Sequence, residues 1–188
     1  MNKEAIRSLF KEKRGELTKE EIRSLSDQII AHFYDFLSSR ANVDHIHLFL
    51  PIDRLNEVDT FPLFYKLQER NFRIYTSIVN NAKEGLDTLE ITHTTRFVND
   101  AWGIPLPAEA MRVSTENIQL ILIPLLAYDT RGYRLGYGKG YYDKYLSEMD
   151  PQVLKVGLSF FEPVDRIPEE PHDIPLDLCI TQNGIRNF

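Results

Sequence analysis

The sequence predicts an α/β fold with a mostly parallel sheet, because strand-like segments alternate along the chain with segments of helical periodicity. The run LILIPLL at 120–126 is apolar throughout, which is typical of a parallel strand covered by helices on both faces. The segment 18–38 repeats apolar residues at helical spacing. The chain has 188 residues without an internal repeat or linker, so we expect one domain spanning 1–188.

Two helices are predicted before the first strand. The segment 3–13 places Ile6, Leu9 and Phe10 on one face, and a glycine ends it. Thr18 and Glu21 have the spacing of a capping box, in which each side chain satisfies a backbone N–H. The apolar residues that follow keep helical spacing: Ile22, Leu25, Ile29, Phe33 and Phe36. We therefore expect a long amphipathic helix from Thr18 to Ser38.

The remaining elements are short. Clusters of apolar, β-branched and aromatic residues predict strands at 45–51, 72–79, 89–92, 120–126, 153–160 and 176–181. Helices are predicted at 61–69 and 140–149. The two prolines of WGIPLP, at 102–107, exclude a helix in the middle of that segment. The proline-rich loop at 162–175 is too short to separate domains, so we expect it to cover a site.

Composition excludes several classes of protein. The net charge of −6 argues against broad nucleic-acid binding, although a local basic pocket for one phosphorylated ligand remains compatible with it. The single cysteine, Cys179, excludes an intrachain disulfide, and its apolar neighbours predict core packing. No segment resembles a signal peptide or a membrane span, so we expect a cytoplasmic protein with no membrane partner. We also expect a monomer that acts on small molecules.

The stretch RLGYGKGYYDKY at 134–145 carries the strongest functional signal. Gly136, Gly138 and Gly140 alternate between a buried strand and a helix, where backbone N–H groups and the helix N-terminus can approach an anion. Lys139 adds a point charge and Arg134 a fork suited to phosphate. The spacing matches neither a Walker A loop nor G-x-G-x-x-G, because a tyrosine follows the last glycine.

A purely structural role for this stretch is the alternative: the glycines make a tight turn and the tyrosines pack. Its position favours a ligand site. It follows the buried strand at 120–126 and so lies beside the carboxyl end of the sheet, where open α/β sheets bind ligands. If Mg²⁺ binds there, Asp143 is the nearby hard oxygen ligand.

The same stretch, extended to Leu146, closely resembles the signature of the 5-formyltetrahydrofolate cyclo-ligase family, also called methenyltetrahydrofolate synthetases. Other pieces occur in the family's order: Lys3 with Arg7, LPIDRLNEVDT at 50–60, Gly-Ile-Pro at 103–105 and PLLAYD at 124–129. The resemblance implies conversion of 5-formyltetrahydrofolate and ATP to 5,10-methenyltetrahydrofolate, ADP and phosphate with Mg²⁺. It also implies a three-layer α/β fold like that of sugar-phosphate isomerases and CoA transferases.

The implied chemistry suits these residue types. Phosphorylation turns the amide-like formyl oxygen into a good leaving group, and a neighbouring folate nitrogen then closes the ring and expels phosphate. Such a reaction needs backbone donors, cations and Mg²⁺ that align the formyl oxygen with the γ-phosphate, rather than a protein nucleophile.

The resemblance also implies site residues. Those expected to contact ATP are Lys3, Glu4, Ala5, Ile6, Arg7, Arg134, Leu135, Gly136, Tyr137, Gly138, Lys139, Gly140, Tyr141 and Tyr142. Those expected to contact the folate are Ile52, Glu57, Trp102, Tyr137, Gly138, Lys139, Gly140 and Tyr141. Arg134 and Lys139 are the candidates for stabilising the transferred phosphate. Asp143 and Asp173 are the candidates for holding Mg²⁺.

Each residue also has an ordinary structural interpretation. Lys3 and Arg7 lie i, i+4 on a helix and suit a solvated face. Glu57 lies in a polar loop, Trp102 suits a core, and Asp143 suits the first turn of its helix. His45 and His47 share a face at strand spacing, but no third ligand is evident, so we do not expect a metal site there.

The chain departs from the family pattern at three positions. Leu125 stands where the family usually has glycine, Leu106 where it often has an acid, and Lys144 where it often has arginine. Two other functions stay open: a phosphosugar- or CoA-handling enzyme on a related fold, and a module that senses ATP without chemistry. Glu57 and Asp143 favour the enzyme, because a sensor needs no folate contact.

Overall fold

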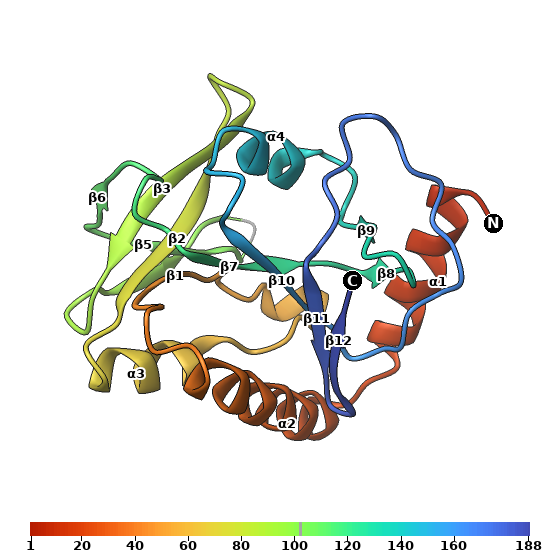
Figure 1. The fold of residues 1–188 in the computed structure, drawn as a ribbon, viewed down its shortest axis with the longest axis horizontal. Helices are drawn as coiled ribbons and strands as arrows, with labels where there is room; N and C mark the ends of the chain where they lie inside the picture. The colour runs from red at the N-terminus through yellow and green to blue at the C-terminus, as the bar shows by residue number, and fades with distance from the viewer. Residues whose placement is uncertain (102) are drawn as a thin grey trace.

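The computed structural model describes residues 1–101 and 103–188, and in this part of the chain the main sheet has eight strands (Figure 1). In sheet order they are β12 (Gly184–Asn187), β11 (Leu178–Thr181), β10 (Leu154–Leu158), β7 (Leu120–Pro124), β1 (His45–His47), β2 (Arg73–Asn80), β3 (Gly85–Ile91) and β6 (Met111–Arg112). From β11 to β2 neighbouring strands run parallel, while β12, β3 and β6 pair antiparallel. The predicted α/β fold with a mostly parallel sheet is confirmed.

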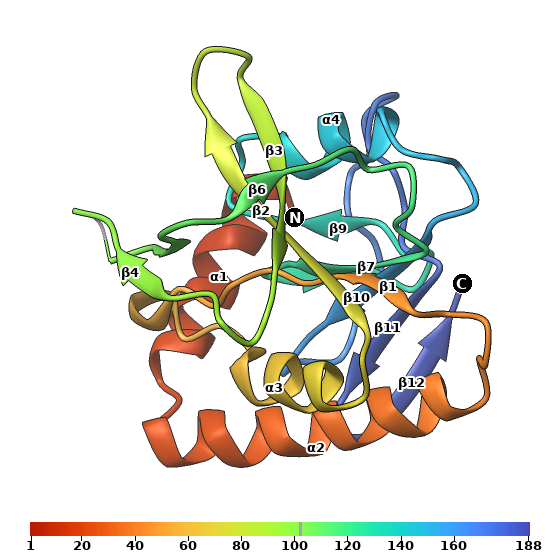
Figure 2. The same cartoon turned by 90° about the vertical axis from the view of Figure 1, so that its left-hand side faces the viewer.

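Helices lie on both faces of this sheet. The helices are α1 (Lys3–Gly15), α2 (Lys19–Ser38), α3 (Phe61–Glu69) and α4 (Tyr141–Ser147), with a 3₁₀ turn, η1, at Asp53–Leu55. Figure 1 shows α2 and α3 below the sheet and α4 above it, and Figure 2 shows α2 running beneath the strands. Helix α1 packs at one end, beside the small hairpin of β8 (Ala127–Tyr128) and β9 (Arg134–Leu135).

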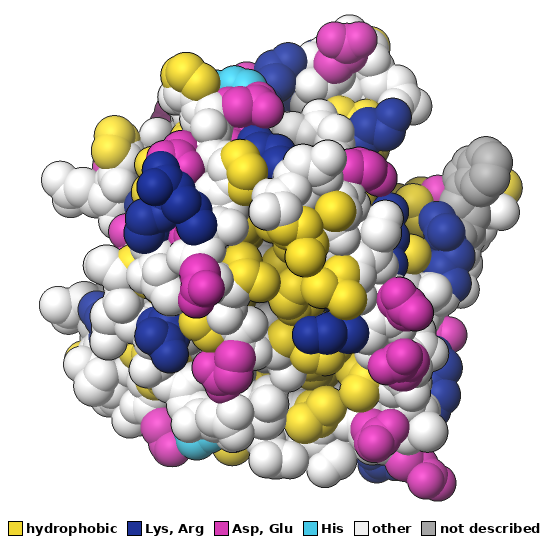
Figure 3. Space-filling view, turned by 90° about the vertical axis from the view of Figure 1, so that its right-hand side faces the viewer, with side chains coloured by type: hydrophobic (Ala, Val, Ile, Leu, Met, Phe, Trp, Pro, Cys, Tyr) yellow, Lys and Arg dark blue, Asp and Glu magenta, His cyan; other side chains and the backbone are white. Residues whose placement is uncertain are grey.

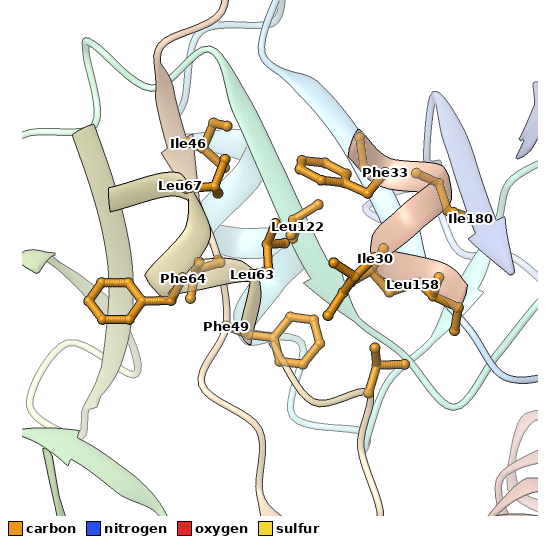
Figure 4. Packing of buried hydrophobic residues seen from close by; sticks show 14 of the residues in the cluster. Ile30, Phe33, Ile46, Phe49, Leu63, Phe64, Leu67, Leu122, Leu158 and Ile180 are labelled. Carbon is orange, nitrogen blue, oxygen red and sulfur yellow. The ribbon is translucent and has the colours of Figure 1, made fainter. Parts of the chain in front are cut away.

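Strand β7 is buried on both faces, as its sequence predicts. Leu120 and Leu122 belong to the core that α2 and α3 cover, whereas Ile121 and Ile123 belong to the core beneath α4. Figure 4 shows the first of these cores, where Phe33 of α2 lies across from Leu122. Side chains of a strand alternate between the faces of a sheet, so a strand between two helical layers is apolar at every position.

The predicted helices in the first third of the chain are confirmed. The capping box forms: Glu21 N–H donates to the Thr18 hydroxyl at 3.2 Å, and Thr18 N–H donates to the Glu21 carboxylate at 2.8 Å. The predicted helix at 61–69 has the same bounds as α3, and Cys179 is fully buried in the core, as predicted.

Several predicted strand boundaries are wrong. The strand predicted at 45–51 ends at His47, and the one predicted at 120–126 ends at Pro124, which has no N–H to donate. Strand β3 begins at Gly85 rather than Leu89, because it forms a seven-pair hairpin with β2. The sequence analysis missed β4 (Phe97–Asn99), β5 (Pro105–Pro107), β6, β8, β9 and β12. These strands are only two to four residues long, so none is long enough to show a strand pattern in the sequence.

The molecular surface around α1 is mixed in charge. Figure 3 looks onto this side and shows basic and acidic side chains interspersed around a hydrophobic area, so this face has no extended field of one sign. Across residues 1–101 and 103–188, no helix combines the length and apolar character needed to cross a membrane.

Candidate active site

A cleft of about 1330 Å³ opens at the carboxyl ends of the parallel strands. Its walls include Leu50, which follows β1, residues 77–79 near the end of β2, and Pro124 at the end of β7. The glycine stretch and residues 168–170 of the proline-rich loop also line it. Both segments therefore lie where the sequence analysis expected them, at the ligand-binding end of the sheet.

Most residues of the predicted site line this cleft. They are Lys3, Glu4, Arg7, Ile52, Glu57, Asp143, Asp173 and every residue from Arg134 to Tyr142. Two predicted ATP contacts do not: Ala5 is exposed outside the lining, and Ile6 is buried in the core between α1 and β9. Ile6 faces inward because it lies on the apolar stripe of α1 together with Phe10. The predicted folate contact Trp102 lies outside the described residues.

The glycine stretch forms a loop between β9 and α4 whose backbone needs glycine at two positions. Gly138 has φ 98° and Gly140, the N-cap of α4, has φ 67°. A Cβ at Gly138 would also lie 3.4 Å from the guanidinium carbon of Arg7, whose Nε donates to the carbonyl of Gly136 at 3.1 Å. Helix α1 therefore supports the loop directly.

Lys139 lies at the tip of this loop. It is exposed, and within the described part of the chain it has neither an ion-pair partner nor a hydrogen-bond partner. An unpaired ammonium beside several loop N–H groups is a suitable partner for a phosphate.

Arg134 and Asp143 form an ion pair behind the loop. The Arg134 Nη2 lies 2.9 Å from Asp143 Oδ1, the Arg134 Nη1 donates to the carbonyl of Ile174, and the Ile174 N–H donates to the same carboxylate oxygen at 3.1 Å. Burial lowers the pKa of Arg134, and its pairing with Asp143 opposes that effect. The pair joins α4 to the proline-rich loop and leaves Asp143 Oδ2 without a partner among the described residues.

Lys3 ties the first turn of α1 to the same loop. Its ammonium lies 2.7 Å from Asp173 Oδ2 and 3.3 Å from Glu170 Oε1. Burial raises the pKa of Asp173, but Lys3 and the Glu170 N–H outweigh it and hold the value below normal. The side chains of Glu170, His172 and Asp173 bring their ligand atoms within 4.8 Å of one another. The sequence analysis singled out only Asp173 of these three.

The proline-rich loop is anchored at Ile167 by a buried carboxylate. Asp129, fully buried after β8, accepts hydrogen bonds from the Ile167 N–H at 3.0 Å and from Arg131 at 2.8 Å. Arg131 also pairs with Glu169 at 2.8 Å. The loop is therefore held on both sides of the cleft edge, by Arg131 at one side and Lys3 at the other.

Glu57 forms the floor of the cleft on the side of η1. Only 6% of Glu57 is exposed, its Oε2 accepts the N–H of Ile52 at 2.8 Å, and its Oε1 accepts the hydroxyl of Tyr137 at 2.7 Å. Burial raises the pKa of Glu57, and the Ile52 N–H, the Tyr137 hydroxyl and the charge of Arg14 oppose that effect. The structure thus joins the predicted folate-binding carboxylate to the glycine loop through one hydroxyl.

Arg14 is the residue of this region that the sequence analysis missed. It looked like an ordinary basic residue in the last turn of a helix, yet it is 3% exposed and contacts Tyr137. One signal was available: Lys3, Arg7 and Arg14 follow i, i+4, i+11, which places all three on one side of the helix.

The three departures from the family pattern have distinct surroundings. Leu125 is buried and packs against Gly157, Leu106 lines the cleft, and Lys144 donates to the carbonyl of Lys83 at 2.6 Å. Leu125 is therefore a core residue, and Lys144 ties α4 to the β2–β3 hairpin.

His45 and His47 have different surroundings, although they share a face of β1. His45 Nδ1 lies 2.7 Å from the Tyr75 hydroxyl. His47 is fully buried between the sheet and α4, and its ring nitrogens have no partner among the described residues. Burial lowers the pKa of His47 to about 3, so its imidazole is neutral.

Comparisons with known proteins identify the family of this chain. Residues 1–182 match the model of the 5-formyltetrahydrofolate cyclo-ligase family. A 5-formyltetrahydrofolate cyclo-ligase of Mycoplasma genitalium is 30% identical over 183 residues, covering 96% of this chain and 98% of that protein. The structure of a 5,10-methenyltetrahydrofolate synthetase from Mycoplasma pneumoniae matches with a TM-score of 0.80 and 28% identity, covering 97% and 99% of the two chains. The NMR structure of the Aquifex aeolicus 5,10-methenyltetrahydrofolate synthetase matches with a TM-score of 0.83 and 32% identity, covering 100% and 93%. The chain belongs to the 5-formyltetrahydrofolate cyclo-ligase family.

Proposed function

We propose that this chain closes 5-formyltetrahydrofolate to 5,10-methenyltetrahydrofolate at the expense of ATP. One observation carries the proposal furthest: the glycine loop and a buried carboxylate open into the same cleft and are joined by Tyr137. The relatives named above are 5-formyltetrahydrofolate cyclo-ligases and 5,10-methenyltetrahydrofolate synthetases, and they match the chain over nearly its full length.

The phosphate end of the cleft supplies charge and donors. In the proposal, the backbone N–H groups of residues 138–140 and the ammonium of Lys139 surround the γ-phosphate. Lys3 and Arg7 approach the nucleotide from α1. The guanidinium of Arg134 already has two partners, so its part in the proposal is to hold Asp143 rather than to meet phosphate directly.

The other end of the cleft suits a reduced pterin. Each oxygen of Glu57 accepts one hydrogen bond from the protein and retains a lone pair for a donor in the cleft. A pterin presents neighbouring N–H donors along one edge, which match a carboxylate in the way that an arginine fork does. Apolar side chains form the remaining wall: Leu50, Leu55, Ile78, Ile104 and Leu106.

Two carboxylates fit a magnesium ion that accompanies ATP. Asp143 and Asp173 line the cleft. In each, one oxygen accepts from two protein donors, while the other has no hydrogen-bond partner among the described residues. Such a pair suits Mg²⁺, which binds nucleotides through one or two carboxylates and the phosphates. When bound, Mg²⁺ would neutralise the charge that builds up on the phosphates.

The residues of this chain then act by alignment. Glu57 fixes the pterin ring, and the loop fixes the γ-phosphate, so that the formyl oxygen attacks phosphorus in line and ADP leaves. The carbon that bears the phosphorylated oxygen is next attacked by the neighbouring folate nitrogen. A C–N bond forms, the nitrogen releases its proton to solvent, and the C–O bond breaks as phosphate departs with the former formyl oxygen. No protein nucleophile is needed, and none of the described residues in the lining is a cysteine.

The direct test is to mix the purified chain with 5-formyltetrahydrofolate and MgATP and to follow the near-ultraviolet absorbance of the methenyl product. We expect the band to grow with ATP and to stay absent with a non-hydrolysable ATP analogue. A folded chain that binds MgATP yet neither binds nor converts the folate would contradict the proposal and favour nucleotide sensing.

A further inference from the structure

The guanidinium of Arg14 is buried next to the cleft and is not part of its lining. Its Nη1 donates to the hydroxyl oxygen of Tyr137 at 3.0 Å and its Nη2 donates to the carbonyl of Leu125 at 2.6 Å. Its Nε has no partner among the described residues. A buried cation is costly unless it meets an opposite charge.

The opposite charge is reached through Tyr137. A tyrosine hydroxyl has one hydrogen, and here it points to Glu57 Oε1 at 2.7 Å, while its lone pair accepts from Arg14. The three groups form a one-way chain of donors from guanidinium to phenol to carboxylate. Polarisation along such a chain strengthens each bond, and strengthens it most when the last group is ionised.

We propose that Arg14 is a positioning residue for the folate site: through the Tyr137 hydroxyl it holds Glu57 ionised and oriented toward the cleft. The inference rests on the function proposed above, because it gives Glu57 a donor-rich ligand to accept. Arg14 itself does not line the cleft. It acts on the substrate only through the other two residues.

The groups that act on Glu57 come from several elements. Arg14 belongs to α1, Tyr137 to the glycine loop and Tyr142 to α4, while the N–H of Ile52 lies beside η1. Of these, Arg14 is the cation. Its removal raises the pKa of Glu57 further above normal, since burial already raises it. A protonated Glu57 would lose part of its capacity to accept, so folate affinity would begin to fall at a higher pH.

A purely structural role makes a different prediction. Arg14 also links α1 to neighbouring segments, because its own carbonyl accepts from Asn56 at 2.9 Å and its side chain binds the carbonyl of Leu125. If these links were its whole role, replacement would lower the melting temperature and leave the pH dependence of folate binding in the folded fraction unchanged.

The experiment measures the Kd of 5-formyltetrahydrofolate by calorimetry across pH, which needs no turnover. The variants are Arg14→Met, Arg14→Lys and Tyr137→Phe, with Lys13→Met as the matched control from the same helical turn, because Lys13 is exposed and outside the cleft. The Kd of MgATP is measured beside it.

For Arg14→Met we expect folate affinity to fall by about tenfold or more, since a charge-assisted hydrogen bond is lost. The pH below which folate affinity falls (the acid limb of the plot of Kd against pH) should move to a higher value. The affinity for MgATP should stay near wild type. Tyr137→Phe should move the limb in the same direction, and the double variant should show less than the sum of both effects. Arg14→Lys, which keeps the charge but loses the fork, should keep the wild-type limb with weaker binding.

An unmoved acid limb in a folded Arg14→Met or Tyr137→Phe chain would overturn the inference. If Arg14→Met does not fold, Tyr137→Phe decides by the same criterion. Equal losses of folate and MgATP affinity would also overturn it, because they would indicate a general collapse of the cleft. A wild-type chain that binds no folate would instead contradict the proposed function, so the two failures are distinguishable.

Discussion

The two faces of the sheet differ in chemistry. The core beneath α2 and α3 is built from aliphatic and phenylalanine side chains, whereas the core beneath α4 also contains His47, Tyr128, Tyr145 and Cys179. Both cores reach the cleft: Phe49 of the first core lines it, and the second core lies beneath the helix that follows the glycine loop. The comparison teaches that the first core contributes apolar burial, whereas the second also places polar and aromatic side chains beneath α4.

The largest effect should come from the apolar face. Phe33 of α2 is fully buried, and Phe33→Ala should lower the free energy of unfolding by about 3–5 kcal/mol, because the cavity adds to the lost burial. Chemical denaturation measures it. The turnover of each folded molecule should stay the same, and exposed Tyr65→Ala on α3 should cost about 0.5 kcal/mol or less. A loss of turnover in folded Phe33→Ala would show that packing on this face also affects catalysis.

A substitution in the cleft should have the opposite effect, with lower turnover and unchanged stability. Lys139→Ala should lower kcat by about 100- to 1000-fold, the usual loss when one transition-state donor is removed. The melting temperature should not change, because Lys139 is exposed and has no partner in the described part of the chain. Stopped-flow and thermal-shift measurements check both halves, with exposed Lys13→Ala as the control. Wild-type turnover would remove Lys139 from the chemistry.

His47 tests whether the polar side chains buried beneath α4 lower the free energy of unfolding. Its imidazole has a pKa of about 3 in the folded chain against an ordinary 6.5, so the unfolded chain binds a proton first. The contribution of His47 to the free energy of unfolding is therefore fully present above pH 6.5. It is lost as the pH falls from 6.5 to about 3, by about 1.4 kcal/mol per pH unit.

The variant for this test is His47→Leu. It should be more stable than wild type by about 1–3 kcal/mol at pH 7, because an unpartnered polar group is removed, and the gap should widen at pH 5. Urea titrations at both pH values measure the difference, and exposed His93→Gln serves as the control. An identical pH slope in both chains would mean that His47 has a partner in solution.

The smallest expected effect concerns Asp143, the carboxylate that we propose binds Mg²⁺. Asp143→Asn should raise the Mg²⁺ concentration for half-maximal rate by about tenfold, since a neutral amide is a weaker ligand. Asp165→Asn is the control, because Asp165 is exposed in the proline-rich loop and does not line the cleft. Matching Mg²⁺ titrations for wild type and Asp143→Asn would place the metal elsewhere.

The sequence analysis succeeded where the signal is local. The capping box at Thr18 and the stripe behind it depend on residues within one helix, and the glycine loop is a continuous stretch. It failed where a strand is too short to show a pattern, as for the two-residue strands β8 and β9. It also failed where distant segments meet, because Arg14 is buried against Leu125 and Tyr137. Ile6 was assigned to ATP from the resemblance, and its side chain lies in the core, where helical periodicity places it.

The anchors of the proline-rich loop bear on the entropy of ligand binding. A free loop of this length would lose conformational freedom each time a nucleotide ordered it. Here Asp129 and Arg131 hold the loop at Ile167 and Glu169, and Lys3 holds it at Asp173. The chain therefore loses that freedom once, when it folds. If a nucleotide binds as we propose, binding would require an exchange of ionic partners at Lys3 and Asp173 but no ordering of the loop.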